Sequence, residues 1–194
     1  PGIVGTYAAG GRSVSQRDAE VAFVWDAQSP AQQLPVGPFQ AQWQGKLLVR
    51  APGKYRFYAQ VQGQVEATLA KQPILAGQTD VGAPAKWISG PEVEFEYGEH
   101  PLVVAFQSTG QTARLKLYWS SESFALEPIP SGAYFLGEVH PEFEVVAQGK
   151  ELFAAHRCNR CHQREHDPQS PPGPDLTHAS YNLTEEGLER WLNS

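Results

Sequence analysis

The chain has 194 residues, which is enough for one large domain or two small ones. Its 15 Lys and Arg against 21 Asp and Glu give a net charge of −6, and the lack of any basic cluster argues against nucleic acid as the main partner. No apolar run approaches the roughly 20 residues that cross a bilayer, so no membrane span is expected in this chain.

The region from Gly2 to about Trp119 has the pattern of short strands. Apolar and polar residues alternate there, which places one face of each strand on a core and the other in water. Turn signals such as Ala51-Pro52-Gly53 and Ser89-Gly90-Pro91 recur about every 8–12 residues, as in an antiparallel sandwich or barrel. The clearest alternating stretches are residues 39–51, 55–61, 93–97, 102–106 and 114–119.

The pattern changes around residues 120–141, where prolines, serines and glycine indicate a connection without a long strand or helix. Beyond it, apolar residues from Val145 to Phe153 recur at helical spacing. A second helix is predicted near the C-terminus, capped by Asn182 or Thr184. These signals predict a β domain followed by a small α domain, with the boundary near residues 130–142.

The segment Cys158-Asn159-Arg160-Cys161-His162 reads C-x-x-C-H, the attachment signature for a c-type haem. Two thiols one turn apart can add to the two vinyl groups of a haem, and the adjacent imidazole can then reach the iron. The alternatives are half of a zinc site, a redox dithiol and a chance match. A zinc ion would need two more ligands, for which only scattered histidines are available, and a redox dithiol is expected after a βαβ unit that this chain lacks.

From about Val146 onward the sequence resembles the class I cytochrome c family. Gly149-Lys-Glu-Leu-Phe153 is similar to its N-terminal helix, and Gly173-Pro174-Asp175-Leu176 is similar to its proximal loop. The resemblance implies haem c bound covalently through Cys158 and Cys161, iron ligated by His162, and the Pro174 carbonyl accepting a hydrogen bond from that imidazole. The family's distal Met is absent, because the chain stops at Ser194 before that loop, which predicts a fragment. A bis-histidine haem using His166 or His178 is the alternative.

Four segments together resemble the anthrax protective antigen-type sandwich domain, over roughly Gly2 to Phe135. Family members that bind sugars hold Ca²⁺ with two consecutive aspartates after the Tyr-x-Phe strand, whereas the matching stretch here, residues 60–65, has no carboxylate. Ca²⁺-dependent sugar binding is therefore not expected at that place. Exposed aromatics such as Tyr58 or Trp87 could still stack on a sugar or a partner, although aromatics in a sandwich more often belong to the core. The four segments are Gly2–Tyr7, Trp43–Leu47, Gly53–Phe57 and Arg114–Trp119.

The predicted fold class is mainly β with a small α part: an antiparallel β-sandwich over residues 1–135, followed by an incomplete all-α cytochrome c domain over residues 136–194. The predicted function is electron transfer through the haem in an exported protein, periplasmic or at the cell surface, with a redox protein as partner. The alternative is a carbohydrate- or partner-binding module that leads a larger oxidoreductase. No nucleophile elbow, phosphate loop or catalytic triad signature is present, so the chain by itself is not expected to be an enzyme.

Overall fold

The computed structural model describes residues 2–137, 149, 152–153 and 155–156. The chain divides into two compact units, residues 1–138 and 139–194. The strands lie in the first unit, and a short 3₁₀ turn, η1 (Ser131–Ala133), precedes the last of them. They are β1 (Ile3–Ala9), β2 (Arg12–Asp18), β3 (Ala22–Asp26), β4 (Gln40–Val49), β5 (Gly53–Gln62), β6 (Gln64–Leu69), β7 (Gln72–Gln78), β8 (Lys86–Phe95), β9 (Gly98–Gln107), β10 (Thr112–Ser121), β11 (Phe124–Pro128) and β12 (Tyr134–Phe135).

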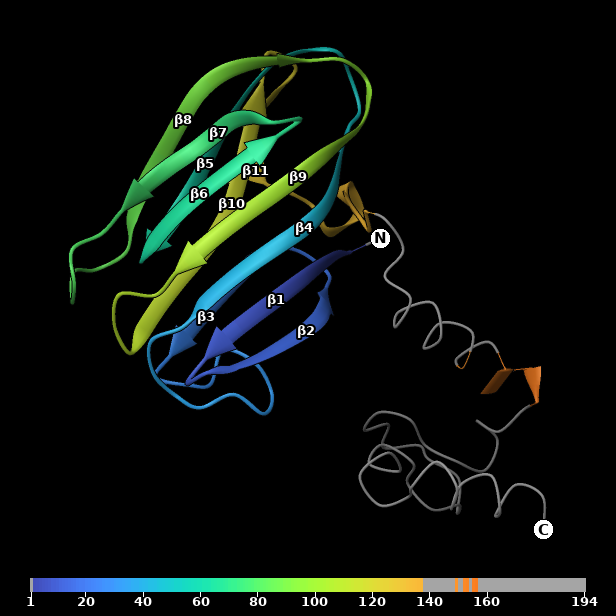
Figure 1. Ribbon diagram of the computed structural model, residues 1–194. Helices are drawn as coiled ribbons and strands as arrows, with labels where there is room; N and C mark the ends of the chain where they lie inside the picture. Colours follow the sequence, from blue (N-terminus) through green and yellow to red (C-terminus); the bar gives the residue numbers. More distant parts are fainter. Residues whose placement is uncertain (1, 138–148, 150–151, 154, 157–194) are drawn as a thin grey trace, which may run out of the picture. The chain divides into compact units, whose positions relative to one another are not determined.

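These strands form two antiparallel sheets (Figure 1). The first has seven strands in the order β2-β1-β4-β9-β6-β7, with β12 added on β4. The second has five strands in the order β11-β10-β5-β8, with β3 paired to β10. Each sheet turns one face toward the other, which leaves the remaining face of each sheet toward solvent.

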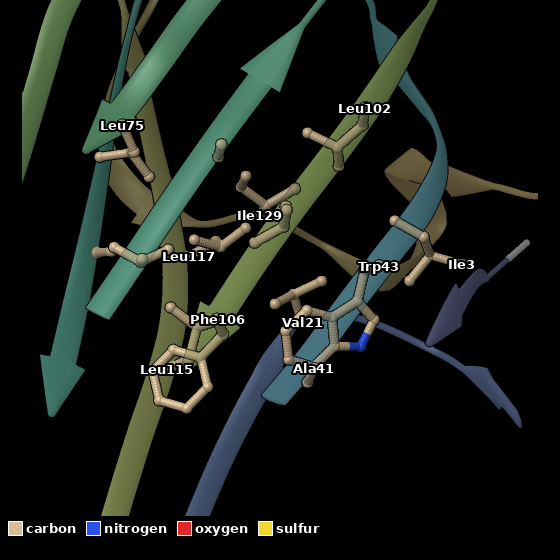
Figure 2. Close-up of a cluster of buried hydrophobic side chains, with 14 of the residues drawn as sticks. Ile3, Val21, Ala41, Trp43, Leu75, Leu102, Phe106, Leu115, Leu117 and Ile129 are labelled. Atoms are coloured by element: carbon tan, nitrogen blue, oxygen red, sulfur yellow. The ribbon is translucent and has the colours of Figure 1, made fainter. Parts of the chain in front are cut away.

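The alternation of apolar and polar residues decides which face of each sheet lies against the core. In β4, Ala41, Trp43 and Leu47 are buried, whereas Gln40 and Gln42 are exposed. The same alternation runs through β5, β9 and β10, as the sequence pattern predicts. Figure 2 shows side chains from both sheets meeting in one core, among them Trp43, Leu102, Phe106, Leu115 and Leu117.

Antiparallel pairing brings five connections to one end of the sandwich, here called the loop end. They are residues 10–11, 27–39, 62–63, 79–85 and 108–111. Backbone contacts fasten this end: Ser108 donates its N–H to the Phe39 carbonyl and Thr79 donates to the Gly63 carbonyl, at 3.0 and 2.8 Å.

One predicted turn is wrong. Ser89-Gly90-Pro91 lies inside β8, where the register with β5 shifts between Arg56 and Tyr58. A Cβ at Gly90 would overlap the Ile74 carbonyl, so the glycine allows two backbones to approach closely. The proline beside it is tolerated because the bulge interrupts the ladder. Tyr97, the last residue of the alternating stretch 93–97, lies in the turn between β8 and β9 and is 68% exposed.

The predicted fold class is also wrong. The described residues form a nearly all-β fold of two sheets and contain no all-α cytochrome domain. Beyond residue 137 the structure describes a helical conformation at Gly149, Leu152, Phe153 and Ala155, and Leu152 is 58% exposed. A short apolar stripe at helical spacing is too brief to specify a domain, because the same spacing also occurs in an isolated turn of helix. The predicted helix near the C-terminus lies outside the described residues.

One buried carboxylate ties β1, β2 and β4 together. The Asp18 side chain accepts hydrogen bonds from the Tyr7 hydroxyl at 2.5 Å, the Trp43 indole at 2.8 Å and the Gln16 amide at 2.8 Å. Burial and the neighbouring Asp18 carboxylate raise the pKa of Tyr7 far above its ordinary value, so its hydroxyl remains a donor. These bonds hold a charged group inside the sheet with its acceptor sites occupied.

We expect Asp18→Ala to lower the free energy of unfolding by about 3–5 kcal/mol, because the substitution leaves two buried donors without an acceptor. Urea unfolding followed by circular dichroism measures this. Asp26→Ala, at an exposed position of β3, is the matched control and should change stability by only about 0.5 kcal/mol. Equal losses in the two variants would show that the Asp18 cluster does not stabilise the fold.

Candidate functional site

The four residues predicted to hold a haem, Cys158, Cys161, His162 and Pro174, lie outside the described residues. The alternative ligands His166 and His178 lie there as well. The assignment of these residues to a haem site therefore stays a prediction.

The place where the sandwich-domain resemblance implies a Ca²⁺ site is the turn between β5 and β6, at the loop end. Gln62 occupies it, and its amide donates to the Ala83 carbonyl at 3.0 Å and to the Thr112 hydroxyl at 3.1 Å. Gly63 follows with φ +139°, a conformation that favours glycine, and its N–H donates to the Thr79 hydroxyl at 2.8 Å. This turn is closed by the protein's own hydrogen bonds and offers no carboxylate.

The side chains present do not fit a calcium ion, which takes six to eight oxygen ligands and usually several carboxylates. Across the described part of the chain, no group of three or more His, Cys, Asp or Glu side chains is placed to hold a metal. That Ca²⁺ is not held at Gln62-Gly63 stays a prediction, which the measurement below tests.

A different site lies on the outer face of the five-stranded sheet. Tyr58 on β5 and Tyr118 on β10 are directly opposite each other, and both point away from the core because their neighbours Phe57 and Trp119 are buried. On β8, Trp87 lies opposite Gln60 of β5. Three aromatic side chains from three adjacent strands therefore share one solvent-facing surface, here called the aromatic face.

Trp87 is the centre of the aromatic face. Its side chain is 51% exposed, and its ring lies 4.8 Å from that of Tyr118, with the two planes inclined at 59°. The two rings are therefore in contact at an inclined angle, and about half of the Trp87 surface remains accessible to a ligand. A large aromatic ring held in place by a neighbour and exposed on its other side loses little conformational entropy when a flat apolar surface stacks on it.

Hydrogen-bonding groups surround these rings. Gln60 and Lys116 are directly paired across β5 and β10, and Gln60 is also paired with Trp87. The Tyr58 hydroxyl accepts a hydrogen bond from Ser120 at 3.4 Å. An amide, an ammonium and a phenol beside an open indole can hold a ligand that has both an apolar face and hydroxyl groups, which is the chemistry of a pyranose.

Sequence reasoning had identified Tyr58 and Trp87 as possible stacking residues but not Tyr118 or Gln60. The missing information was strand pairing, because β5, β8 and β10 are distant in the sequence. The alternating pattern did assign Tyr118 to the solvent side of its strand, opposite Leu117 and Trp119.

The family model of the PA14 domain matches residues 1–132. The chain is 28% identical over 119 residues to the anti-sigma-I factor RsgI3 of Acetivibrio thermocellus, a match that covers 61% of this chain and 18% of that protein. In structure it is similar to an anti-sigma factor domain-containing protein, with 25% identity, a TM-score of 0.62, and coverage of 70% of this chain and 47% of that one. The chain thus spans less than half the length of these two relatives.

A PA14 sugar-binding domain from an RTX adhesin shares the fold, with a TM-score of 0.54 and 14% identity over 70% of this chain and 98% of that one. The relatives are named for regulation and for sugar binding. In the part of the chain that the structure describes, no helix is long and apolar enough to cross a membrane.

These findings correct the cytochrome interpretation. The matched family model and the relatives replace the class I cytochrome c resemblance, and the predicted haem c is overturned with it. They support the predicted alternative, a binding module, rather than electron transfer. The C-x-x-C-H motif specifies only three side chains within five residues, whereas the family match extends over 132 residues. The short motif is therefore the weaker evidence for a family.

We expect millimolar Ca²⁺ to leave the melting temperature unchanged, because Gln62 and its hydrogen bonds occupy the place of the aspartate pair. A ligand at one hundred times its dissociation constant would add about 2.7 kcal/mol of stability. Differential scanning calorimetry with Ca²⁺ and with EDTA measures this, and Mg²⁺ serves as the control ion. A rise of several degrees that EDTA reverses would contradict the geometry described for this turn.

Proposed function

The chain belongs to the PA14 domain family, and from that premise we propose that it is a carbohydrate-binding module that uses the aromatic face without calcium. The observation that carries the proposal is the half-exposed Trp87, held 4.8 Å from Tyr118 on a solvent-facing sheet. A sugar-binding relative with the same fold supports the ligand class.

The binding mode follows from the side chains. One apolar face of a pyranose would stack on the open indole of Trp87. Its hydroxyl groups would reach the Gln60 amide, which can both donate and accept, and the Lys116 ammonium, which donates. Each of these groups holds the sugar without changing a covalent bond, in keeping with a role in binding rather than catalysis.

The proposal also concerns location and partners. An adhesin relative supports a site of action outside the cytoplasm, in the periplasm or at the cell surface, where polysaccharides are available. The anti-sigma factor relatives support a second role for the same binding event, in which the module reports a bound glycan to the rest of a longer regulatory protein. The larger oxidoreductase predicted from the haem motif is not proposed.

We expect Trp87→Ala to weaken binding to polysaccharides at least tenfold, which corresponds to about 1.4 kcal/mol, because the stacking surface is lost. Affinity electrophoresis in gels that contain a panel of neutral and acidic polysaccharides measures the loss as a restored mobility. Circular dichroism checks that the variant retains its fold.

Tyr97→Ala is the matched control, since it removes an aromatic side chain that is more exposed than Trp87 but lies in the β8–β9 turn. Its mobility should equal that of the unaltered protein. The proposal fails if no polysaccharide in the panel retards the unaltered protein, or if the two variants behave alike.

A further inference from the structure

A depression of about 400 Å³ lies on the opposite side of the sandwich, on the outer face of the seven-stranded sheet. Its outward-facing lining comes from β1, β4, β9 and β6 and is rich in glutamine: Gln40, Gln42, Gln64 and Gln107. Thr6 and Glu66 complete its polar groups, and the small side chains of Ala8 and Ala105 leave the space between them open. We call this depression the glutamine groove.

Strand register places three of these glutamines in a row. Gln40 is directly opposite Gln107, and Gln107 is directly opposite Gln64. Neighbouring strands are about 4.8 Å apart, so the row presents one amide per strand at that interval. Four strands span about 14 Å, and the interval between them is close to the length of one pyranose in a linear chain.

The amides of this row are available to a ligand. The side chains of Gln40, Gln64 and Gln107 make no hydrogen bond to any other described residue, whereas the Thr6 hydroxyl is engaged by Ser15 at 2.9 Å. A primary amide carries two donors and an acceptor, so each can bind a pair of neighbouring hydroxyl groups. A regular row of such groups matches a regular polyhydroxylated chain laid across the strands.

The charge and the composition of the groove lining determine which class of ligand fits it. Glu66 is the one charged side chain in the lining, and no lysine or arginine contributes to it. An anionic chain would meet a carboxylate without a compensating cation, which disfavours it. The outward-facing lining also has no aromatic ring, because Phe106 points into the core, so a flat apolar ligand finds no stacking partner there.

From these observations we infer that the glutamine groove is a second binding site, specific for a neutral linear oligosaccharide that crosses β1, β4, β9 and β6. The inference extends the proposed function to the other face of the sandwich. The module then holds two glycan chains, one on each face. Binding in the groove depends on hydrogen bonds alone, so it is weaker than at the aromatic face.

The test uses the Trp87→Ala protein, in which the aromatic face is disabled, so that failure of this inference and failure of the proposed function are distinguishable. Cellohexaose is the neutral probe and hexagalacturonic acid the anionic one. We expect cellohexaose to shift the side-chain amide signals of the groove glutamines in ¹⁵N NMR spectra, and hexagalacturonic acid to produce no saturable shift.

Two substitutions remove the groove in different ways. Gln42→Ala deletes one amide, and Ala105→Phe fills the open space without deleting a hydrogen-bonding side chain. Each should weaken cellohexaose binding at least tenfold. Gln44→Ala is the matched control, because Gln44 is also an exposed glutamine of β4 but lies outside the lining, and it should change affinity less than twofold.

Three results would overturn the inference. The first is the absence of saturable shifts with cellohexaose in the Trp87→Ala protein, and the second is unchanged affinity in the Ala105→Phe variant. The third is a dimer in sedimentation velocity that Ala105→Phe dissociates, which would assign the groove to a second copy of this chain. A monomer with the expected affinity pattern supports the groove as a glycan site.

Discussion

Burial of one face of each sheet against the other is the constraint on which this structure depends. Each strand contributes alternate residues to the core, so the remaining residues must face water. In a sandwich covered by helices, the outer faces would be occupied by other elements. Within the first unit, the outer faces of both sheets carry exposed side chains, and those side chains are free to vary in chemistry without cost to the core.

The two outer faces differ for this reason. The groove on the seven-stranded sheet presents glutamines and small residues, whereas the aromatic face of the five-stranded sheet presents Trp87, Tyr58 and Tyr118 beside Gln60 and Lys116. The bulge at Gly90 shifts the register of β8 against β5. On the N-terminal side of this bulge, Trp87 lies opposite Gln60 and its ring meets Tyr118, a strand further away. The backbone bulge at Gly90 and the aromatic side chain of Trp87 thus lie close together on β8.

How much of the fold and of the proposed sites could be predicted depends on how far apart in the sequence the interacting residues lie. Alternation is local, so the buried sides of β4, β5, β9 and β10 could be predicted from the sequence alone. The row of Gln40, Gln107 and Gln64 could not, because it exists only when β4, β9 and β6 are paired in one register. The same holds for Asp18 of β2, whose buried donors, Tyr7 and Trp43, come from β1 and β4. The short haem motif misled for the opposite reason: it is entirely local, and a local motif specifies a site only when the surrounding fold is present.

The absence of carboxylates at Gln62-Gly63 and the chemistry of the two faces have a common physical basis. At the loop end, Gln62 donates to Ala83 and Thr112, and Thr79 and Ser108 join neighbouring connections. Hydrogen bonds within the protein therefore take up the groups that a metal and a sugar would otherwise share, and a ligand there would have to break them. The sheet faces have less such competition, because their backbone groups are already paired in the ladders and the side chains of Gln40, Gln64 and Gln107 make no hydrogen bond to another described residue. A ligand at the sites proposed on the two faces would therefore gain hydrogen bonds and stacking at little cost in existing bonds, and this difference in free energy favours the faces over the loop end as proposed binding sites.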